Sequence, residues 1–531
     1  MALETETDSI VQQFEYSDND VNKAVKEFLR QADEGLEKDG TSLSQIPTYV
    51  TAVPNGTEKG LYMAVDLGGT NFRVCSIQLL GDGTFSHTYN KVAVPKNLMV
   101  AKKAEDLFAF LAQEIKKFLE EHHSEDFEHH IRRRMTVSSP DGFRDEHIFR
   151  MGFTFSFPVK QVGINKGTLI RWTKGFDIPD AIDKDVCALL QAEIDKLHLP
   201  IKVAALVNDT VGTLMARSYA APGKNGSVLG AIFGTGTNGA YVEKLSKLKK
   251  PLAGDYDQST GEMVINTEWG SFDNQLNVLP TTKWDASLEK DSLNPGFQMY
   301  EKRVSGMFLG EILRLVVVEL LNNPEVSFFK DENSSSNDRG SVTIISRDSG
   351  LFKQWGLDTA IMSTAELDQD PELTGLRQAL ENTLHVYAPA YEDALAFKKV
   401  AHAIGRRAAR LSAVAIGAIV LQTGKLNDKD VTEEDPIDIG VDGSLVEHYP
   451  GFRPMIYEAL RAIDGIGEEG AKRIRIGLTQ DGSGVGAALI ALVAAGMEKN
   501  ANAEYIGELR STAKAAAATD GSADEKATNS D

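Results

Sequence analysis

The stretch LYMAVDLGGTNFR, residues 61–73, constrains the fold more than any other part of the sequence. Residues 61–65 form an apolar run that predicts a buried strand, and Asp66 and two glycines after it predict a tight turn. Residues 73–80 then show alternating apolar character, which indicates a second strand. Because a strand follows the turn, we predict a β-hairpin here rather than a strand-to-helix junction.

The same design recurs in the second half of the chain. An apolar run at 228–233 leads into GTGTNG at 234–239 and returns as a strand at 240–243. This repetition predicts two similar α/β halves. Further strands are predicted at 151–157, 201–207, 437–441 and 474–478, and helices at 20–37, 105–121, 308–322, 398–421 and from the glycines at 482–486 to 495.

Composition and charge restrict the class of protein. The 531 residues need two or more subdomains, and 42% apolar with 25% charged residues is typical of a globular chain. A formal net charge of -21 argues against nucleic-acid or anionic-membrane partners. Two cysteines cannot form a disulfide framework, and neither a long apolar run nor a secretion signal is evident. We therefore expect a cytoplasmic protein.

The glycine turns are candidates for phosphate binding. Residues 66–71 and 234–237 each combine backbone N–H groups free of side chains with a hydroxyl at a sharp turn. Both can equally be ordinary hairpins, and this alternative stays open. The match to the dinucleotide fingerprint at 234–239 is followed by a strand instead of a helix. The match at 482–487 lacks the strand and the acidic residue that a dinucleotide-binding unit has about 20 positions later, and no Walker A sequence occurs.

Asp209 is the candidate general base. It follows the apolar strand 203–207, and ligand crevices lie at the carboxyl ends of strands in open α/β sheets. A carboxylate there can accept a hydroxyl proton during phosphoryl transfer. The alternative is that Asp209 caps the helix beginning near Val211.

Polar side chains within otherwise apolar segments suit a polyhydroxyl ligand, because each sugar hydroxyl both donates and accepts hydrogen bonds. These side chains are Ser156, Thr173, Lys174, Glu268 and Glu301. Each of them alone can also be a helix cap or a solvated charge.

Four histidines near one another, His122, His123, His129 and His130, lie in a polar segment. Without cysteines or ordered ligand spacing they predict a solvated loop rather than a metal site.

Taken in order, these stretches resemble the hexokinase family, specifically its fungal-type glucokinase branch. The matching motifs are residues 65–73, 153–158, 171–176, 207–213, 232–243, 266–274, 295–306, 440–444 and 481–488. They extend from about Pro47 to Ala495, and their combination is highly specific.

The resemblance implies an actin-like ATPase (ribonuclease H-like) fold, with two α/β lobes built on mixed five-stranded sheets around a central cleft. The expected organisation is a flexible segment at 1–18, a helix and connector at 19–60 packing on the large lobe, a small lobe at 61–207, a large lobe at 208–481, a return of 482–497 to the small lobe, and a disordered tail at 498–531. The lobes are expected to close on sugar.

The resemblance also implies ATP-dependent phosphorylation of glucose at the 6-hydroxyl, with Mg²⁺ held mainly through the phosphates and water and with no protein metal site. Asp209 and Lys174 are the implied catalytic residues. The implied sugar ligands are Ser156, Thr173, Lys174, Asn208, Asp209, Asn238, Glu268, Gln298 and Glu301. The implied nucleotide-binding residues are Asp66, Gly68, Gly69, Thr70, Asn71, Arg73, Gly234, Thr235, Gly236, Asp442, Gly443, Ser444, Gly482 and Ser483.

Two alternatives remain within this resemblance, a broad-specificity hexokinase that also uses fructose and mannose, and a catalytically weak glucose sensor. Phe297 stands where many hexokinases have Gln, which favours the glucokinase branch. Use of mannose, glucosamine or fructose stays open, and a monomer or weak homodimer is expected.

Overall fold

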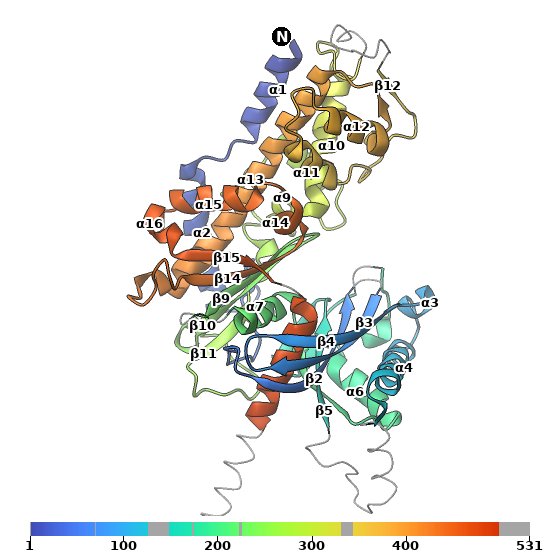
Figure 1. The fold of residues 1–531 in the computed structure, drawn as a ribbon, viewed down its shortest axis with the longest axis vertical. Coiled ribbons are helices and arrows are strands. Elements are labelled where there is room, and N and C mark those ends of the chain that lie inside the picture. Colours follow the sequence, from blue (N-terminus) through green and yellow to red (C-terminus); the bar gives the residue numbers. More distant parts are fainter. Residues whose placement is uncertain are drawn as a thin grey trace, which may run out of the picture.

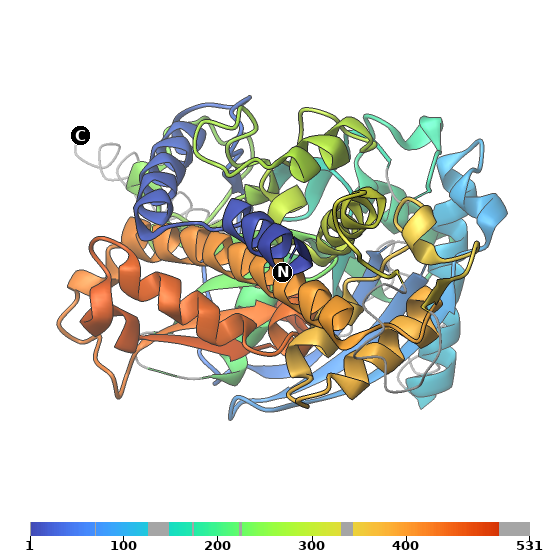
Figure 2. The same ribbon diagram turned by 90° about the horizontal axis from the view of Figure 1, so that it is seen from above.

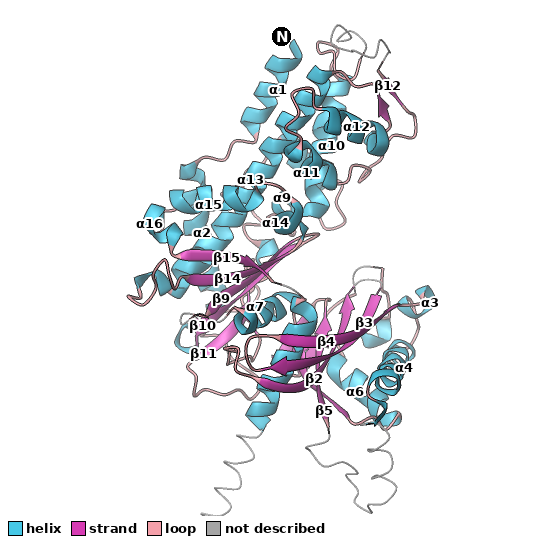
Figure 3. Ribbon diagram, in the orientation of Figure 1, coloured by secondary structure: helices cyan, strands magenta, loops and turns pink. Residues whose placement is uncertain are grey.

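Two large β-sheets, each with its own helices, organise the described part of the chain (Figures 1 and 3). The computed structural model describes residues 2–68, 71–125, 148–172, 175–221, 223, 226–330, 343–479 and 481–498. Of the tail predicted at 498–531, all residues but Glu498, which ends a helix, lie outside the described residues. So do Gly69, Thr70, Thr173, Lys174, His129 and His130. No helix among the described residues is long and apolar enough to cross a membrane.

The five-stranded sheet has the strand order β4-β3-β2-β5-β8. Its strands are β2 (Lys59–Gly68), β3 (Asn71–Leu80), β4 (Phe85–Ala93), β5 (Phe149–Phe155) and β8 (Ile201–Val207). Strands β2, β3 and β4 pair antiparallel, whereas β2, β5 and β8 pair parallel, so the sheet is mixed. The predicted hairpin is confirmed, with Gly68 opposite Asn71.

The second sheet repeats this order and adds one strand, as β1-β11-β10-β9-β14-β15. Its strands are β1 (Ile46–Pro47), β9 (Ser227–Phe233), β10 (Thr237–Lys244), β11 (Glu262–Asn266), β14 (Ile437–Asp442) and β15 (Ile474–Leu478). The expectation of five strands is therefore wrong for this sheet, because the connector contributes the short β1 at its edge. The mixed α/β fold class itself is confirmed.

Helices cover both sheets. They are α1 (Ala2–Gln13), α2 (Asp18–Glu37), α3 (Lys96–Met99), α4 (Ala104–His122), α6 (Val186–Lys196), α7 (Asp209–Ala220), α8 (Lys283–Lys290), α9 (Glu301–Val304), α10 (Gly306–Asn322), α11 (Ala360–Leu367), α12 (Thr374–Leu384), α13 (Tyr391–Thr423), α14 (Ser444–His448), α15 (Phe452–Ala462), α16 (Gly467–Lys472) and a helix at 482–498. The two-stranded pairs are β6 (Val159–Gly163) with β7 (Lys166–Leu169), and β12 (Ile344–Ile345) with β13 (Val386–Tyr387).

Helices α4 and α6 pack on one face of the five-stranded sheet. Helix α7 and the helix at 482–498 share a core with the other face and with residues of β10 and β11. These two helices therefore lie between the sheets, where the chain passes from one half of the molecule to the other (Figure 1).

The N-terminal segment differs from the flexible segment expected at 1–18. It forms helix α1, whose Leu3, Ile10 and the following Phe14 are buried. The Phe14 ring stacks on Trp284 at 5.3 Å, and the guanidinium of Arg407 lies over it at 4.8 Å. Viewed from above, α1 lies along α13 (Figure 2). Apolar contact with the long helix thus orders a segment whose composition is acidic.

Candidate active site

The candidate residues gather at the carboxyl ends of parallel strands in both sheets. Asp66 lies near the end of β2, Asn208 follows β8, Gly234 follows β9, and Asp442 ends β14. Because parallel strands end at one edge of a sheet, each sheet presents its polar residues on one side. A cavity of about 620 Å³ is lined by Asp66 of the first sheet and by Asp442 of the second.

The β2–β3 hairpin forms one wall of this cavity through Asp66, Gly68 and Asn71. A Cβ atom added to Gly68 would lie 3.3 Å from Asp66 Oδ1 and 3.5 Å from Ser156 Oγ. Ser156 therefore lies beside the glycine turn, although it follows a different strand. A side chain at Gly68 would fill the space that backbone N–H groups need to approach a phosphate.

Arg73 connects this hairpin to the start of the helix at 482–498. Its Nη1 lies 2.7 Å from Asp481 Oδ1, and its Nη2 donates to Ser483 Oγ at 2.6 Å. The second carboxylate, Asp66 Oδ2, is 3.7 Å from Nη2. Thr154 Oγ1 also donates to the Ser483 carbonyl, at 2.9 Å. The predicted residues Arg73, Gly482 and Ser483 are thus brought together in the same cavity wall.

The β9–β10 hairpin, also predicted, is confirmed by the pairing of Phe233 with Thr237. The Gly234 N–H donates to Gly236 O at 3.0 Å, and the Gly234 carbonyl accepts from Gly306 at 2.7 Å. Thr235 O accepts from the Met307 N–H at 3.3 Å. This turn is therefore joined to the start of α10.

Asp442 lies on the other wall of the cavity and accepts from the Gly443 N–H at 2.6 Å. Burial, together with the charges of Glu447 and Asp481, raises the pKa of the Asp442 carboxyl. Gly443 is followed at once by Ser444, the first residue of α14. The cavity itself is lined by Asp442 but by neither Gly443 nor Ser444, nor by the glycines at 234 and 236.

Three cavity residues on β4 were missed by the sequence analysis, namely His87, Tyr89 and Lys91. They alternate along one face of the strand, and the His87 and Tyr89 rings lie 5.7 Å apart. Their two-residue period is visible in the sequence. Only the pairing of β4 with β3 shows that this face borders the cavity.

A polar cluster built around Glu268 lies on the six-stranded sheet. Its Oε1 accepts from Asn266 Nδ2 at 2.8 Å and from Asn238 Nδ2 at 3.3 Å. Burial raises the pKa of Glu268, and the charge of Asp209 raises it further, whereas the Asn266 and Asn238 hydrogen bonds and the charge of Arg171 lower it. Glu268 has a left-handed backbone conformation, with φ at 53°.

Glu301 belongs to the same electrostatic cluster. Its Oε2 accepts from the Thr237 N–H at 3.0 Å, and a Cβ atom at Gly236 would lie 2.8 Å from this oxygen. Burial raises the pKa of Glu301, and the charges of Glu268 and Asp209 act in the same direction. Glu301 thus joins the glycine turn to the carboxylate cluster.

Asn208 and Asp209 begin helix α7. Asn208 is the N-cap, and its Oδ1 accepts from the Thr210 N–H at 3.0 Å. Asp209 is the first helical residue, and its Oδ1 accepts from the same N–H at 2.9 Å. The alternative in which Asp209 is the cap is therefore wrong, because Asn208 takes that position. Thr210 Oγ1 lies 3.5 Å from Asn238 Nδ2, which connects α7 to the Glu268 cluster.

Gln298 lies next to this cluster, also in a left-handed conformation with φ at 58°. Its Oε1 accepts from Ser271 Oγ at 2.7 Å, and a Cβ atom at Gly270 would lie 2.9 Å from the same oxygen. The amide oxygen is thus held by the turn that follows Glu268. Phe297, the preceding residue, is 63% exposed.

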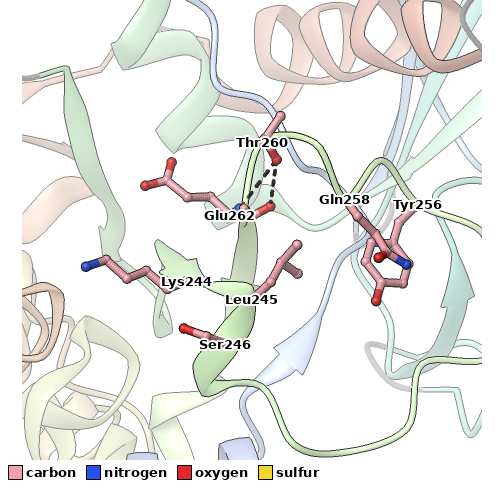
Figure 4. A pocket seen from close by; sticks show the side chains of 8 residues that line it. Lys244, Leu245, Ser246, Tyr256, Gln258, Thr260 and Glu262 are labelled. Atoms are coloured by element: carbon pink, nitrogen blue, oxygen red, sulfur yellow. Dashed lines mark hydrogen bonds between the residues drawn. The ribbon is translucent and has the colours of Figure 1, made fainter.

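A second pocket lies at the other end of the β10–β11 pair (Figure 4). In its lining, Thr260 Oγ1 donates to the Glu262 carbonyl at 3.2 Å and accepts from the Glu262 N–H at 3.4 Å. The pocket is lined by Lys244, Leu245, Ser246, Tyr256, Gln258, Thr260, Gly261 and Glu262, none of which was predicted as a site residue.

Family models described as hexokinase match residues 6–219 and 228–493. The chain belongs to the hexokinase family. This hexokinase is 57% identical over 496 residues to the glucokinase of Aspergillus niger, covering 93% of the chain and 97% of that relative. It is 39% identical to glucokinase-1 of Saccharomyces cerevisiae, covering 92% and 96% of the two chains.

Solved structures agree with this family. The hexokinase of Schistosoma mansoni complexed with glucose is 33% identical, with a TM-score of 0.72 and coverage of 92% of this chain and 98% of that one. Another hexokinase crystal structure is 27% identical, with a TM-score of 0.74, covering 93% and 99%. The predicted family and the fold class are thereby confirmed, and the chain is a hexose kinase.

Proposed function

We propose that this hexokinase transfers the γ-phosphoryl group of MgATP to the 6-hydroxyl of glucose, with Asp209 as the general base. The observation that carries the proposal is the position of Asp209 at the start of α7, where the next residue, Thr210, contacts Asn238 of the Glu268 cluster at 3.5 Å. The charge of Asp209 also raises the pKa of both Glu268 and Glu301. A carboxylate in this cluster can accept a sugar proton while its neighbours accept hydrogen bonds from other hydroxyls.

The base need not remove the proton of the sugar hydroxyl completely before the phosphoryl group is transferred. Phosphoryl transfer has a loose transition state, so orientation and neutralisation of charge supply most of the rate, and proton acceptance by Asp209 contributes about 10²- to 10⁴-fold. Glu268 and Glu301 are proposed to orient the sugar ring through pairs of its hydroxyls. Asn208, Asn238, Gln298 and Ser156 complete the proposed sugar ligands, with Thr173 and Lys174 assigned from the sequence.

The cavity fits a nucleotide. Its volume of about 620 Å³ lies within the usual range for cofactor sites. Arg73 and Lys91 line it together with the carboxylates of Asp66, Asp442 and Asp481, and the Gly68 turn leaves room for a phosphate. Asp66, Asn71, Gly482 and Ser483 complete that wall, while Gly234, Thr235, Gly236, Asp442, Gly443 and Ser444 are proposed to approach the nucleotide from the larger sheet.

Magnesium is part of the proposal, held mainly through the ATP phosphates and water. No group of three or more His, Cys, Asp or Glu side chains suited to a metal occurs among the described residues. Asp66 and Asp442 nevertheless line the cavity, and oxygen ligands are those that Mg²⁺ prefers. When bound, the ion would neutralise charge that develops on the phosphates.

Glucose is the preferred sugar in this proposal, and broad hexose use is the second candidate. The identity of 57% to a glucokinase favours the first. Fructose turnover comparable with glucose turnover would favour the second. We further propose that the protein is a monomer or weak homodimer in the cytoplasm. The two cysteines of the chain, both free and buried, suit a reducing compartment.

The experiment measures ADP formation from MgATP with glucose, mannose, fructose, glucosamine or no sugar. We expect glucose-dependent turnover that falls about 10²- to 10⁴-fold in Asp209→Ala. Asp464→Ala, which removes a carboxylate whose side chain is 73% exposed, is the matched control and should keep full activity. Wild-type turnover in Asp209→Ala would refute the assignment of the base, and no stimulation by any sugar would favour the sensor alternative.

A further inference from the structure

Helix α7 both connects the two sheets and carries Asp209. Its N-cap Asn208 directly follows β8 of the five-stranded sheet, whereas Leu214 and Tyr219 share a core with Ala240 and Val264 of the six-stranded sheet. A base at one end of such a helix keeps its place only if the helix is fixed on the sheet beneath it. Contacts along α7 hold the helix on the six-stranded sheet.

Three glycines in one row of the six-stranded sheet make room for α7. Gly230 of β9 pairs with Gly440 of β14, which pairs with Gly477 of β15. A Cβ atom at Gly230 would lie 2.3 Å from the Leu214 backbone nitrogen. At Gly440 it would lie 2.6 Å from Arg217 Cβ, and at Gly477 it would lie 2.3 Å from Arg217 Nη2. Side chains in this row would therefore displace both the helix and its arginine.

Arg217 is anchored at the end of this row by a buried carboxylate. Its Nε donates to Asp438 Oδ2 and its Nη2 donates to Asp438 Oδ1, both at 2.7 Å, and Asp438 is 1% exposed. Ser227 Oγ and Arg475 Nε also donate to Asp438, both at 2.6 Å. Arg217 Nη1 donates further to the Leu478 carbonyl at 3.3 Å. A bidentate pair of this kind fixes both distance and orientation.

The opposite side of α7 faces the helix at 482–498 through glycines. A Cβ atom at Gly212 would lie 2.5 Å from the Gly482 carbonyl, and one at Gly486 would lie 2.2 Å from Gly212 Cα. The second helix therefore contacts α7 by backbone alone at this point. All the directional bonds described for Arg217 lie on the side of the six-stranded sheet.

We propose that Arg217 is a positioning residue for Asp209. Its bidentate bond to Asp438 holds α7 against the three glycines of the six-stranded sheet. This fixes the Asp209 carboxylate beside Glu268 and Glu301. The inference rests on the proposed function. Because Glu268 and Glu301 lie on other elements, loss of the Arg217–Asp438 bond displaces Asp209 and its neighbour Asn208, whereas the other proposed sugar ligands keep their places. A shift of about 1 Å can cost roughly 10²-fold in rate.

The test compares Arg217→Met with Arg475→Met. Both variants remove one arginine from the same Asp438 carboxylate, but only Arg217 belongs to α7. We expect kcat to fall about 10- to 100-fold in Arg217→Met, with the KM for glucose changed less than about threefold. Arg475→Met should keep kcat within about twofold of wild type and lower the melting temperature less than Arg217→Met does, because Arg475 makes one bond to Asp438 where Arg217 makes two.

Equal kcat losses in the two variants, or an unchanged kcat in Arg217→Met, would overturn the inference. If Arg217→Met does not fold, Arg217→Lys decides it, since lysine keeps the charge but cannot bond both carboxylate oxygens in a fixed geometry. A kcat loss in Arg217→Lys without a change in KM supports the inference, and full kcat overturns it. Wild-type enzyme and Asp209→Ala in the same assay report separately on the proposed function.

Discussion

At the scale of single residues, the site contains carboxylates whose burial opposes their ionisation. Glu268 is the clearest example, because burial and the neighbouring Asp209 both raise its pKa while two amide groups donate to the same oxygen. Ionisation of such a buried group lowers the stability of the folded protein.

Glu268→Gln should therefore stabilise the protein and weaken its binding of sugar. The folded pKa of this acid lies above its unfolded value, so its ionisation destabilises the protein once the pH rises above about 4.3. At pH 7 the variant should unfold about 1–3 °C above wild type, and the difference should vanish below about pH 4. Its KM for glucose should rise about 10- to 100-fold with the loss of charge-assisted hydrogen bonds. Thermal unfolding and sugar titrations measure these effects.

Glu262→Gln is the matched control, because Glu262 lies on the same part of the chain, at the exposed start of β11. It should change neither the melting temperature nor the KM. A lower melting temperature for Glu268→Gln at pH 7 would contradict the prediction.

At the scale of elements, the crossing of α7 and the helix at 482–498 depends on the absence of side chains. Gly486 lies so close to Gly212 that an added methyl group would meet its backbone at 2.2 Å. Overpacking at such a contact typically costs about 1–3 kcal/mol.

Gly486→Ala should lower the free energy of unfolding by about 1–3 kcal/mol and reduce kcat, because the two crossing helices are forced apart. Gly496→Ala, on the same helix with nothing within 4 Å of its added Cβ, provides the comparison. This second variant should be neutral or more stable by up to about 1 kcal/mol, through helix propensity. Denaturant titrations of both variants measure the difference, and equal losses would rule out the crossing contact as the cause.

At the scale of the whole molecule, the cavity is lined from both sheets, and α7 and the helix at 482–498 connect them. Sugar and nucleotide ligands are therefore expected from both sides, so binding should draw the two halves together. Closure of this kind keeps water from replacing the sugar hydroxyl as phosphoryl acceptor.

Saturating glucose should reduce the radius of gyration by a few per cent from about 24 Å, because closure removes solvent from the cleft. Small-angle scattering with and without glucose measures the change, with L-glucose as the control that should leave it unaltered. ADP formation without sugar should remain a small fraction of the glucose-dependent rate. A radius that stays constant while glucose is phosphorylated would exclude closure as the mechanism.

Much of this architecture follows from local sequence pattern. The two glycine hairpins, the strand before Asn208 and the long helix α13 were predicted from residue periods of two or 3.6, which each segment carries by itself. The motif set predicted the family, which the comparisons confirm. Helix α1 was missed because its acidic composition hid the spacing of Leu3, Thr7 and Ile10, all buried.

Other features depend on residues far apart in the sequence. The face of β4 with His87 and Lys91 borders the cavity only because β4 pairs with β3, and neither residue carries a local signal of that contact. The glycine row is a product of strand register, which aligns Gly230 with positions more than two hundred residues later. Sequence by itself determined the elements and the family of this protein, because these depend on local periodicity and motif identity. Only the tertiary structure decided how α7 is held, because burial and hydrogen bonding join atoms that chain order does not bring together.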